Sequence, residues 1–318
     1  MQLPKITLIT PSYNQGHYIE QTIQSVLNQN YPNLEYIIVD GGSTDNTVEI
    51  IKKYTEHIHW WVSEPDNGQA HAINKGLAQT TGDLVNWINS DDYLEPGALQ
   101  ALTKAWQDKQ KGEVFCGYTH CFWDETGDTS HTYRMGMKNN VTSTLHNIEM
   151  NQPGTFYRTE IIKELGGVNE SLRYVFDNEL WMRYLCRYGQ KRVVLLKTLI
   201  AHFRQHGQSK SIGEGFDAFN QEQQAILQFL TKQTYLPGYL QKYVDRDTTE
   251  TNYESENWNM EQLNIQRFHA WFANKYMVSL FNEGDKQNSK KSLFMSLKQQ
   301  QLNWNRKSLG LIKHLLLP

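Results

Sequence analysis

Short apolar segments alternate with helical patterns through residues 5–109 of the chain. Strands are predicted over 5–10, 35–40, 58–62 and 84–88, and helices over 18–28, 44–54, 69–79 and 95–109. The predicted strands are nearly continuous apolar runs, which is typical of parallel strands that are buried on both faces. Strand–helix alternation of this kind favours an α/β fold in which helices cover both faces of a sheet.

Polar side chains follow three of these predicted strands, at the point where each strand ends. Pro11, Ser12 and Tyr13 follow the first strand, Asp40 and two glycines end the second, and residues 89–92 (Asn-Ser-Asp-Asp) follow the fourth. Ligands of open α/β sheets bind at the carboxyl ends of the strands. The sequence therefore predicts that the three polar segments converge on one binding site.

Asp91 and Asp92 form a pair of carboxylates at the mouth of a buried strand. Carboxylate oxygens can hold a divalent cation, and such a cation would neutralise a diphosphate and help it leave. The same residues can instead form an Asx turn or cap the helix that begins near Glu95. Taken alone, the doublet leaves both interpretations open.

Two other turns of the first half can also contact a ligand. Asp40 can accept hydrogen bonds from a nucleoside, while Ser43 or Thr44 caps the next helix, and these two interpretations are compatible. The turn over 64–70, which includes Asn67 and Gly68, leads into a helix whose first amides can face a phosphate.

Two segments of the second half carry candidate chemistry. Asp177 lies at the start of a predicted helix over 177–187; an acid there can complement the helix dipole or serve as a general base. Arg204 and His206 lie close together, and they can clamp a diphosphate and bind a metal ion respectively. A lone histidine is more often structural, so both interpretations of His206 stay open.

The remainder of the chain divides in two by pattern. Residues 113–210 mix strand-like runs (114–122, 155–157, 192–196) with predicted helices (158–165, 177–187), whereas later segments (221–230, 260–281, 290–297) are helical. Gly213 and Gly215 bracket Glu214 at the change of character. We therefore place a boundary there, between residues 1–214 and residues 215–318.

Taken in order, five motifs resemble those of the family-2 glycosyltransferases with the GT-A nucleotide-diphospho-sugar fold. They are residues 10–14, 39–45, 74–76 with 81–83, 89–92 and 177–183. The resemblance covers about the first two thirds of the chain. It implies a Rossmann-like, mostly parallel sheet with helices on both faces in 1–214, made of a nucleotide-sugar-binding half (1–112) and an acceptor half (113–214), and a helical C-terminal region (215–318).

The resemblance also implies an activity: an inverting, metal-dependent hexosyl transfer from a nucleotide-diphosphate donor, expected to be a UDP-sugar, to a hydroxyl of a glycan or lipid-linked acceptor. Asp177 would be the catalytic base. The nucleotide sugar would contact Pro11, Ser12, Tyr13, Asp40, Asn67, Gly68, Asn74, Ser90 and Arg204, and Mg or Mn would bind Asp91, Asp92 and His206. The double glycine at 41 and 42 resembles a subgroup of bacterial surface-polysaccharide enzymes.

Two departures from the family pattern keep alternatives open. Asn89 stands where the family has the first acid of its Asp-x-Asp motif, and Ile73 stands where many relatives have an arginine. A catalytically silent nucleotide-sugar- or glycan-binding module is therefore one alternative. A sugar-phosphate nucleotidyltransferase is a weaker alternative, because no glycine-rich basic loop follows the first strand.

The absence of G-x-G-x-x-G after any strand disfavours an NAD-dependent oxidoreductase.

Charge and hydropathy bear on location. The formal net charge of −3 provides no overall attraction for nucleic acid, so no nucleic-acid partner is expected. We find no leader pattern and no apolar run near the ~20 residues of a membrane span, which favours a cytoplasmic protein. The basic and apolar residues of 290–318 can attach it peripherally to the anionic inner face of the membrane, or form a solvated helix packed on the catalytic domain.

Overall fold

The structure is a computed structural model, and it describes residues 3–207, 209, 215–246 and 253–299. These residues contain a nine-stranded sheet in the order β3-β2-β1-β4-β8-β6-β9-β5, with β7 paired to β6. The strands are β1 (Ile6–Ser12), β2 (Leu34–Asp40), β3 (Trp60–Ser63), β4 (Leu84–Trp87), β5 (Tyr93–Leu94), β6 (Val114–Trp123), β7 (Thr129–Tyr133), β8 (Thr155–Arg158) and β9 (Val193–Gln205).

The first half of the sheet is parallel, as predicted. β1 pairs in parallel with β2 on one side and β4 on the other, and Ile9 is opposite both Ile37 and Trp87. The second half is mixed, because β8 lies antiparallel between β4 and β6 while β6 and β9 are parallel. The apolar pattern of a strand does not indicate its direction. The sequence of β8 therefore does not show that this strand runs antiparallel to β4 and β6.

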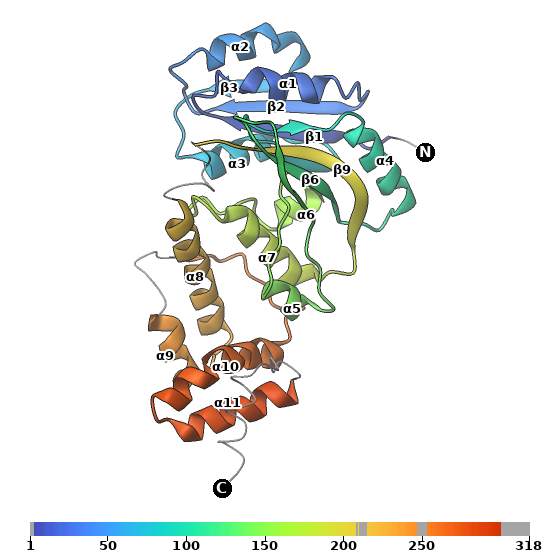
Figure 1. The fold of residues 1–318 in the computed structure, drawn as a ribbon. Coiled ribbons are helices and arrows are strands. Elements are labelled where there is room, and N and C mark those ends of the chain that lie inside the picture. The colour runs from blue at the N-terminus through green and yellow to red at the C-terminus, as the bar shows by residue number, and fades with distance from the viewer. Residues whose placement is uncertain (1–2, 208, 210–214, 247–252, 300–318) are drawn as a thin grey trace.

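Helices cover both faces of the sheet (Figure 1). The helices of the described residues are α1 (Ile19–Leu27), α2 (Thr47–Lys53), the 3₁₀ turn η1 (Thr55–His57), α3 (Gln69–Gln79), α4 (Ala98–Asp108), α5 (Val141–Leu145), α6 (Thr159–Glu164), α7 (Phe176–Tyr188), α8 (Gly215–Gln233), α9 (Gly238–Arg246), α10 (Ile265–Asn282) and α11 (Lys286–Lys298). α1 and α2 lie over one face, and α3, α6 and α7 lie under the other.

Apolar side chains at helical spacing explain this covering. In α1, Ile19, Ile23 and Val26 fall on one side of the helix and are fully buried against the sheet. Burying a side chain of this kind contributes about 1.5–3 kcal/mol. The side chains of successive β1 residues point to opposite faces of the sheet. Leu8 packs in the core beneath α1 and α2, and Ile9 packs in the core that includes residues of α3 and α7.

The C-terminal helices continue the core on the α7 side. Ile226 of α8, Leu240 of α9 and Phe268 of α10 belong to the same buried cluster as Leu180 of α7. The division at residue 214 therefore remains a prediction, because the apolar core is continuous across it. No helix in the described ranges combines the length and apolar character that crossing a bilayer requires.

Candidate functional site at the carboxyl edge of the sheet

The loops that follow β1 and β2 are hydrogen-bonded to each other. The amide nitrogen of Asn14 donates to Ser43 Oγ at 2.7 Å, and Asn14 Oδ1 accepts from the amide of Thr44 at 2.8 Å. Ser12 is buried, and its hydroxyl has no hydrogen-bond partner among the described residues, while Tyr13 is 60% exposed. This edge thus offers a ligand one unused hydroxyl and one open aromatic ring.

Asp40 is buried at the end of β2 and organises the turn that follows it. Its carboxylate accepts hydrogen bonds from the amides of Gly42 (3.1 Å) and Ser43 (2.9 Å) and from the hydroxyls of Ser43 (2.5 Å) and Ser63 (2.6 Å). Gly42 has φ +83°, a conformation that favours glycine. The contact of Asp40 with a nucleoside stays a prediction.

The turn over 64–70 reaches the same edge. A Cβ atom on Gly41 would lie 2.9 Å from Asp66 Oδ2, so glycine permits the approach of this turn. Asp66 Oδ1 accepts the amide of Gly68 at 2.7 Å, which shapes the segment that contains Asn67. Gln69, the first residue of α3, then donates to Asn89 Oδ1 at 2.7 Å. The predicted turn is thereby tied to the loop after β4.

Asn89 joins two parts of that loop. It accepts from Gln69 and donates from Nδ2 to Asp92 Oδ2 at 3.1 Å. An ionised aspartate at position 89 would have no hydrogen to donate to Asp92 and would add a further negative charge beside Asp91 and Asp92. The amide of Asn89 makes both contacts without that charge, which gives the departure from the Asp-x-Asp motif a structural reason.

The two carboxylates of the doublet point to different surroundings. Asp92 is 1% exposed, and its Oδ1 accepts the amide of Arg204 at 2.9 Å. Burial raises the pKa of Asp92 well above its usual range, and the neighbouring Asp91 raises it further. Asp91 is partly exposed. A metal role was predicted for both residues, and of the two carboxylates Asp91 is the one that is accessible.

Asp91, just before β5, contacts His206, just after β9, and these two strands pair with each other. His206 Nε2 lies 3.1 Å from Asp91 Oδ2, and the imidazole stacks on Tyr18 with ring centroids 4.9 Å apart. Within the described ranges, no group of three or more His, Cys, Asp or Glu side chains is placed to hold a metal ion. One carboxylate and one imidazole nevertheless fit a divalent cation whose remaining ligands are phosphate oxygens and water.

Arg204 is enclosed by protein groups. Its Nε donates to the carbonyl oxygen of Asp91 at 2.9 Å, its two terminal nitrogens contact Asp124 and Gln21, and its guanidinium lies 4.9 Å from the ring centres of both Tyr18 and Phe122. These contacts give Arg204 a structural role, joining β9 to the loop after β4. A diphosphate clamp at this residue stays a prediction.

Asn74 and Ser90 are also engaged within the protein. The amide group of Asn74 donates to the carbonyl of Val168 at 2.9 Å and accepts the amide of Val168 at 3.0 Å. The Ser90 carbonyl accepts the hydroxyl of Thr22 at 2.9 Å. Asn74 therefore joins α3 to the segment before α7, and its contact with a nucleotide remains untested.

Asp177 lies in the first turn of α7, and this turn is next to the end of β4. Phe176 packs on Trp87, the last residue of β4, with ring centroids 6.2 Å apart. Asp177 Oδ1 accepts the amide of Asn178 at 2.8 Å. Burial raises the pKa of Asp177 to about 6, although this hydrogen bond lowers it. A carboxylate with this pKa suits general base catalysis near neutral pH.

Two polar residues of this edge were not predicted. Gln152 is buried and donates from Nε2 to the carbonyl of Trp87 at 2.7 Å and to Asn86 Oδ1 at 3.0 Å. Asp124, just beyond β6, accepts the Tyr18 hydroxyl at 3.1 Å and contacts Arg204. Neither residue belongs to a spaced motif, so the sequence alone carries no signal for them.

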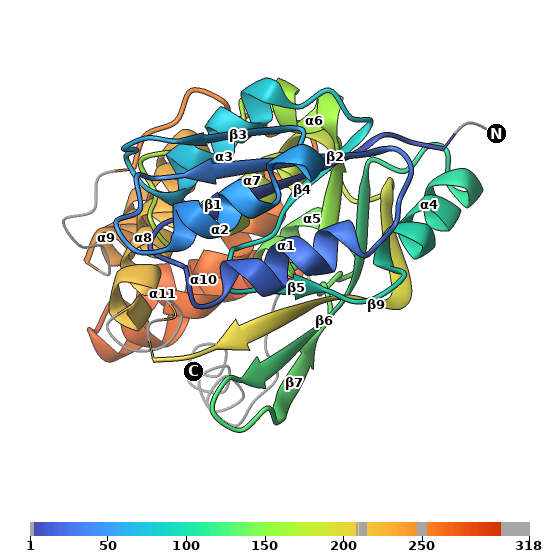
Figure 2. The ribbon, with the colours of Figure 1, turned by 90° about the horizontal axis from the view of Figure 1, so that it is seen from above.

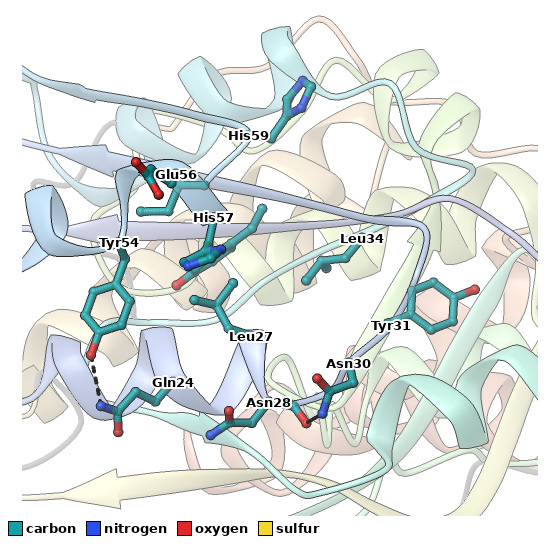
Figure 3. Close-up of a pocket in the computed structure, with 12 residues that line it drawn as sticks. Gln24, Leu27, Asn28, Asn30, Tyr31, Leu34, Tyr54, Glu56, His57 and His59 are labelled. Carbon is teal, nitrogen blue, oxygen red and sulfur yellow. Dashed lines mark hydrogen bonds between the residues drawn. The ribbon is translucent and has the colours of Figure 1, made fainter.

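A separate groove of about 660 Å³ lies at the other end of β2. It is lined by Gln24 of α1, Asn28 just after that helix, Leu34 at the start of β2, and the segment that includes Tyr54 and His57 (Figure 3). None of the predicted site residues lines it. Since β2 runs from Leu34 to Asp40, the groove and the predicted site are at opposite ends of that strand.

Comparison with known proteins finds relatives for the N-terminal half of the chain. A family model described as glycosyl transferase family 2 matches residues 7–166. The putative teichuronic acid biosynthesis glycosyltransferase TuaG of Bacillus subtilis is 36% identical over 152 residues, which are 45% of this chain and 60% of TuaG. The chondroitin synthase of Pasteurella multocida is 36% identical over 121 residues, which are 37% of this chain and 12% of that protein. The chain thus covers 60% or less of these relatives.

Solved structures share the fold at low sequence identity. S. aureus TarS 1–349 in complex with UDP-GlcNAc has a TM-score of 0.57 and 18% identity, over 91% of this chain and 79% of that one. The mannosyltransferase PcManGT from Pyrobaculum calidifontis, in complex with GDP-Man and Mn2+, has a TM-score of 0.51 and 15% identity, over 100% of this chain and 81% of that one. The predicted GT-A fold is confirmed.

Proposed function

Because this chain belongs to glycosyl transferase family 2, we propose that it transfers a sugar, with inversion, from a nucleotide-diphosphate donor to a hydroxyl of a glycan or lipid-linked acceptor. The observation that carries the proposal is that the Asp91–His206 pair and Asp177 lie at the same end of β4. Two similar proteins support a UDP-sugar donor and a role in surface-polysaccharide assembly: TuaG, described as a putative teichuronic acid biosynthesis glycosyltransferase, and TarS, whose structure contains UDP-GlcNAc.

The donor would lie along the carboxyl edge of the sheet. Tyr13 has an open ring that suits a nucleobase, and the Ser12 hydroxyl, the Asp40 turn and the segment of Asn67 and Gly68 lie beside it. The diphosphate would then reach the loop after β4. Asp91 and His206 would hold Mg or Mn there, and the cation would supply charge neutralisation to the diphosphate.

Asp177 would serve as the base. An acceptor hydroxyl gives its proton to the carboxylate while its oxygen forms a bond to the anomeric carbon. The bond from that carbon to the diphosphate oxygen breaks, and the diphosphate leaves with the electron pair. Attack from the side opposite the leaving group inverts the anomeric centre. The hydrogen bond from Asn178 to Oδ1 orients the carboxylate, so that Oδ2 can accept the proton.

A nucleotide-sugar screen tests this function. UDP- and GDP-sugars are assayed with Mn for thermal stabilisation of the full chain and for release of the nucleoside diphosphate, in wild type and in Asp177→Asn. We expect a UDP-sugar to stabilise both proteins and only wild type to turn over. The exposed Asp108 provides the matched control, since Asp108→Asn should behave as wild type.

Two outcomes contradict the proposal. If no nucleotide sugar stabilises the wild-type chain, the alternative of a silent module that binds glycans gains support. If Asp177→Asn keeps wild-type turnover, Asp177 is not the base.

A further inference from the structure

Glu222 of α8 binds three consecutive backbone amides just before α7. Its Oε1 accepts the amide of Arg173 at 2.7 Å, and its Oε2 accepts those of Tyr174 at 2.8 Å and Val175 at 3.0 Å. The side chain is 7% exposed, and it lies 47 residues beyond Val175 in the sequence. Figure 1 shows α8 beside α7, below the sheet.

These bonds hold the backbone that leads into α7. A helix leaves its first four amides without a partner inside the helix, and these include the amide of the N-cap residue, Val175, which Glu222 binds. Val175 itself provides no side-chain cap in the described structure. A carboxylate satisfies such donors with charge-assisted bonds and complements the positive end of the helix dipole. Glu222 therefore fixes the backbone that leads directly into Phe176 and Asp177.

A second contact holds the same turn of α7. Glu179 is fully buried, pairs with Arg183 at 2.7 Å, and accepts the hydroxyl of Tyr253 at 2.5 Å. Trp258 in turn donates to the Tyr253 oxygen at 2.8 Å. Residues from beyond position 214 thus bind α7 at its entry and again along its first turn.

We propose that Glu222 is a positioning residue for the Asp177 carboxylate, and that through it the C-terminal helices take part in the transfer reaction. The inference rests on the proposed role of Asp177 as the base. A displacement of about 1 Å in a reacting group can lower a rate by about two orders of magnitude. Glu222 acts through the backbone of 173–175 and does not itself contact the reacting atoms.

Glu222→Gln tests this role in the full chain. Glutamine keeps the size of the side chain, but it replaces one acceptor oxygen with an NH₂ group that faces the amide hydrogens. We expect kcat to fall about 10- to 100-fold, the Kd for UDP with Mn to stay within about twofold, and amide hydrogen exchange to become faster in the peptide over 170–180. Glu222→Asp keeps a shorter carboxylate. Its kcat and its hydrogen exchange over 170–180 should therefore lie between those of Glu222→Gln and wild type.

Glu283→Gln is the matched control. It also removes a carboxylate contact of the C-terminal helices, to Tyr243 and Arg246, but it touches nothing in α7. Its kcat and the exchange of 170–180 should equal those of wild type. Equal losses in both variants would mean that any weakening of these helices impairs the enzyme, which would overturn the proposal.

The remaining outcomes separate the two proposals. Unchanged exchange over 170–180 in Glu222→Gln overturns the positioning role, whatever the chemistry of Asp177. Faster exchange with unchanged kcat also overturns it, as does a loss of UDP affinity as large as the loss of kcat. A different experiment tests the proposed function: if Asp177→Asn still turns over, Asp177 is not the base.

Discussion

Asp91 Oδ2 lies 3.1 Å from His206 Nε2, although 115 residues separate them in the chain. Two neighbouring features bring them together. β5 pairs with β9, with Tyr93 opposite His202, and the amide of Arg204 binds Asp92. The register of a two-residue strand against β9 therefore determines the distance between the two candidate metal ligands.

Replacing either member of this pair should weaken the binding of metal. We expect Asp91→Asn and His206→Ala each to lower the affinity for Mn by at least about tenfold when UDP is present, because each removes one donor from the shell. Free Mn measured by electron paramagnetic resonance gives the affinity directly. His59→Ala is the control, since that ring is half-exposed at the other end of the sheet. An unchanged affinity in His206→Ala would remove the histidine from the site.

The rate of transfer should depend on the ionisation of Asp177. The pKa of this carboxyl in the unliganded protein is raised to about 6 and the base must be ionised, so kcat/KM should be constant above that pH and fall about tenfold per unit below it. Initial rates between pH 5 and pH 8.5 at low substrate concentration measure this. A profile without a break near pH 6 would contradict the assignment.

Asp177→Asn should make the folded protein more stable near neutral pH. The folded pKa lies above the unfolded value of 3.8, so ionisation of this group disfavours the folded state as pH rises from about 4 to about 6. Removing the charge should raise the free energy of unfolding by roughly 1–3 kcal/mol at pH 8. Urea unfolding of both proteins at pH 8 and pH 4 checks the sign, because the difference should fall to about 0.5 kcal/mol at pH 4.

Arg204→Lys distinguishes a structural arginine from a diphosphate clamp. One ammonium group cannot reach Asp124, Gln21 and the Asp91 carbonyl at once, so we expect a loss of roughly 2–4 kcal/mol in the free energy of unfolding. Arg246→Lys, at an exposed ion pair, should change stability by less than about 0.5 kcal/mol. Unchanged stability with weaker binding of UDP would favour the clamp.

The exposed face of α11 provides a test of membrane contact. Phe294 is 52% exposed, and Lys290, Lys291 and Lys298 stand four residues before, three before and four after it, so that they share its side of the helix. The rest of the predicted basic segment, residues 300–318, lies outside the described residues. Each lysine near an anionic surface contributes up to about 1 kcal/mol.

Replacing these three lysines with glutamine should therefore reduce co-sedimentation with phosphatidylglycerol vesicles. Pure phosphatidylcholine vesicles, which carry no net charge, are the control and should pellet wild type and variant alike. Equal pelleting of both proteins with the anionic vesicles would rule out a contact through this face.

The first half of the fold follows from its sequence because each strand there is a short apolar run with a polar end. β1, β2 and β4 are adjacent and parallel, so residues 11–14, 40–43 and 89–92 lie at one edge of the sheet as predicted, while the binding site expected there stays a prediction. β7 was not predicted, since Thr-Ser-His-Thr-Tyr is polar and forms a strand through its pairing with β6. The elements β5 and α5 were missed because they are too short for a periodic pattern, whereas α9 was missed although Leu240, Tyr243 and Val244 have helical spacing.

The later elements depend on partners that are distant in sequence. The predicted strand over 192–196 extends to Gln205, because pairing with β6 continues through the polar residues His202 and Arg204. Glu222 sits in a helix with many polar residues, and nothing in its sequence neighbourhood points to the amides of 173–175. Such contacts arise from tertiary packing, which local patterns do not encode.

β9 is the last strand in chain order within the described residues, yet it lies inside the sheet, between β6 and β5. During synthesis on a ribosome, residues 6–63 can form three neighbouring parallel strands long before residue 193 is made. Until β9 arrives, Asp92 lacks the Arg204 amide and Asp91 lacks His206. Closing so long a sequence separation is slow compared with local folding. Translation of residues 193–206 thus sets the earliest time at which a newly made chain can complete its candidate metal site.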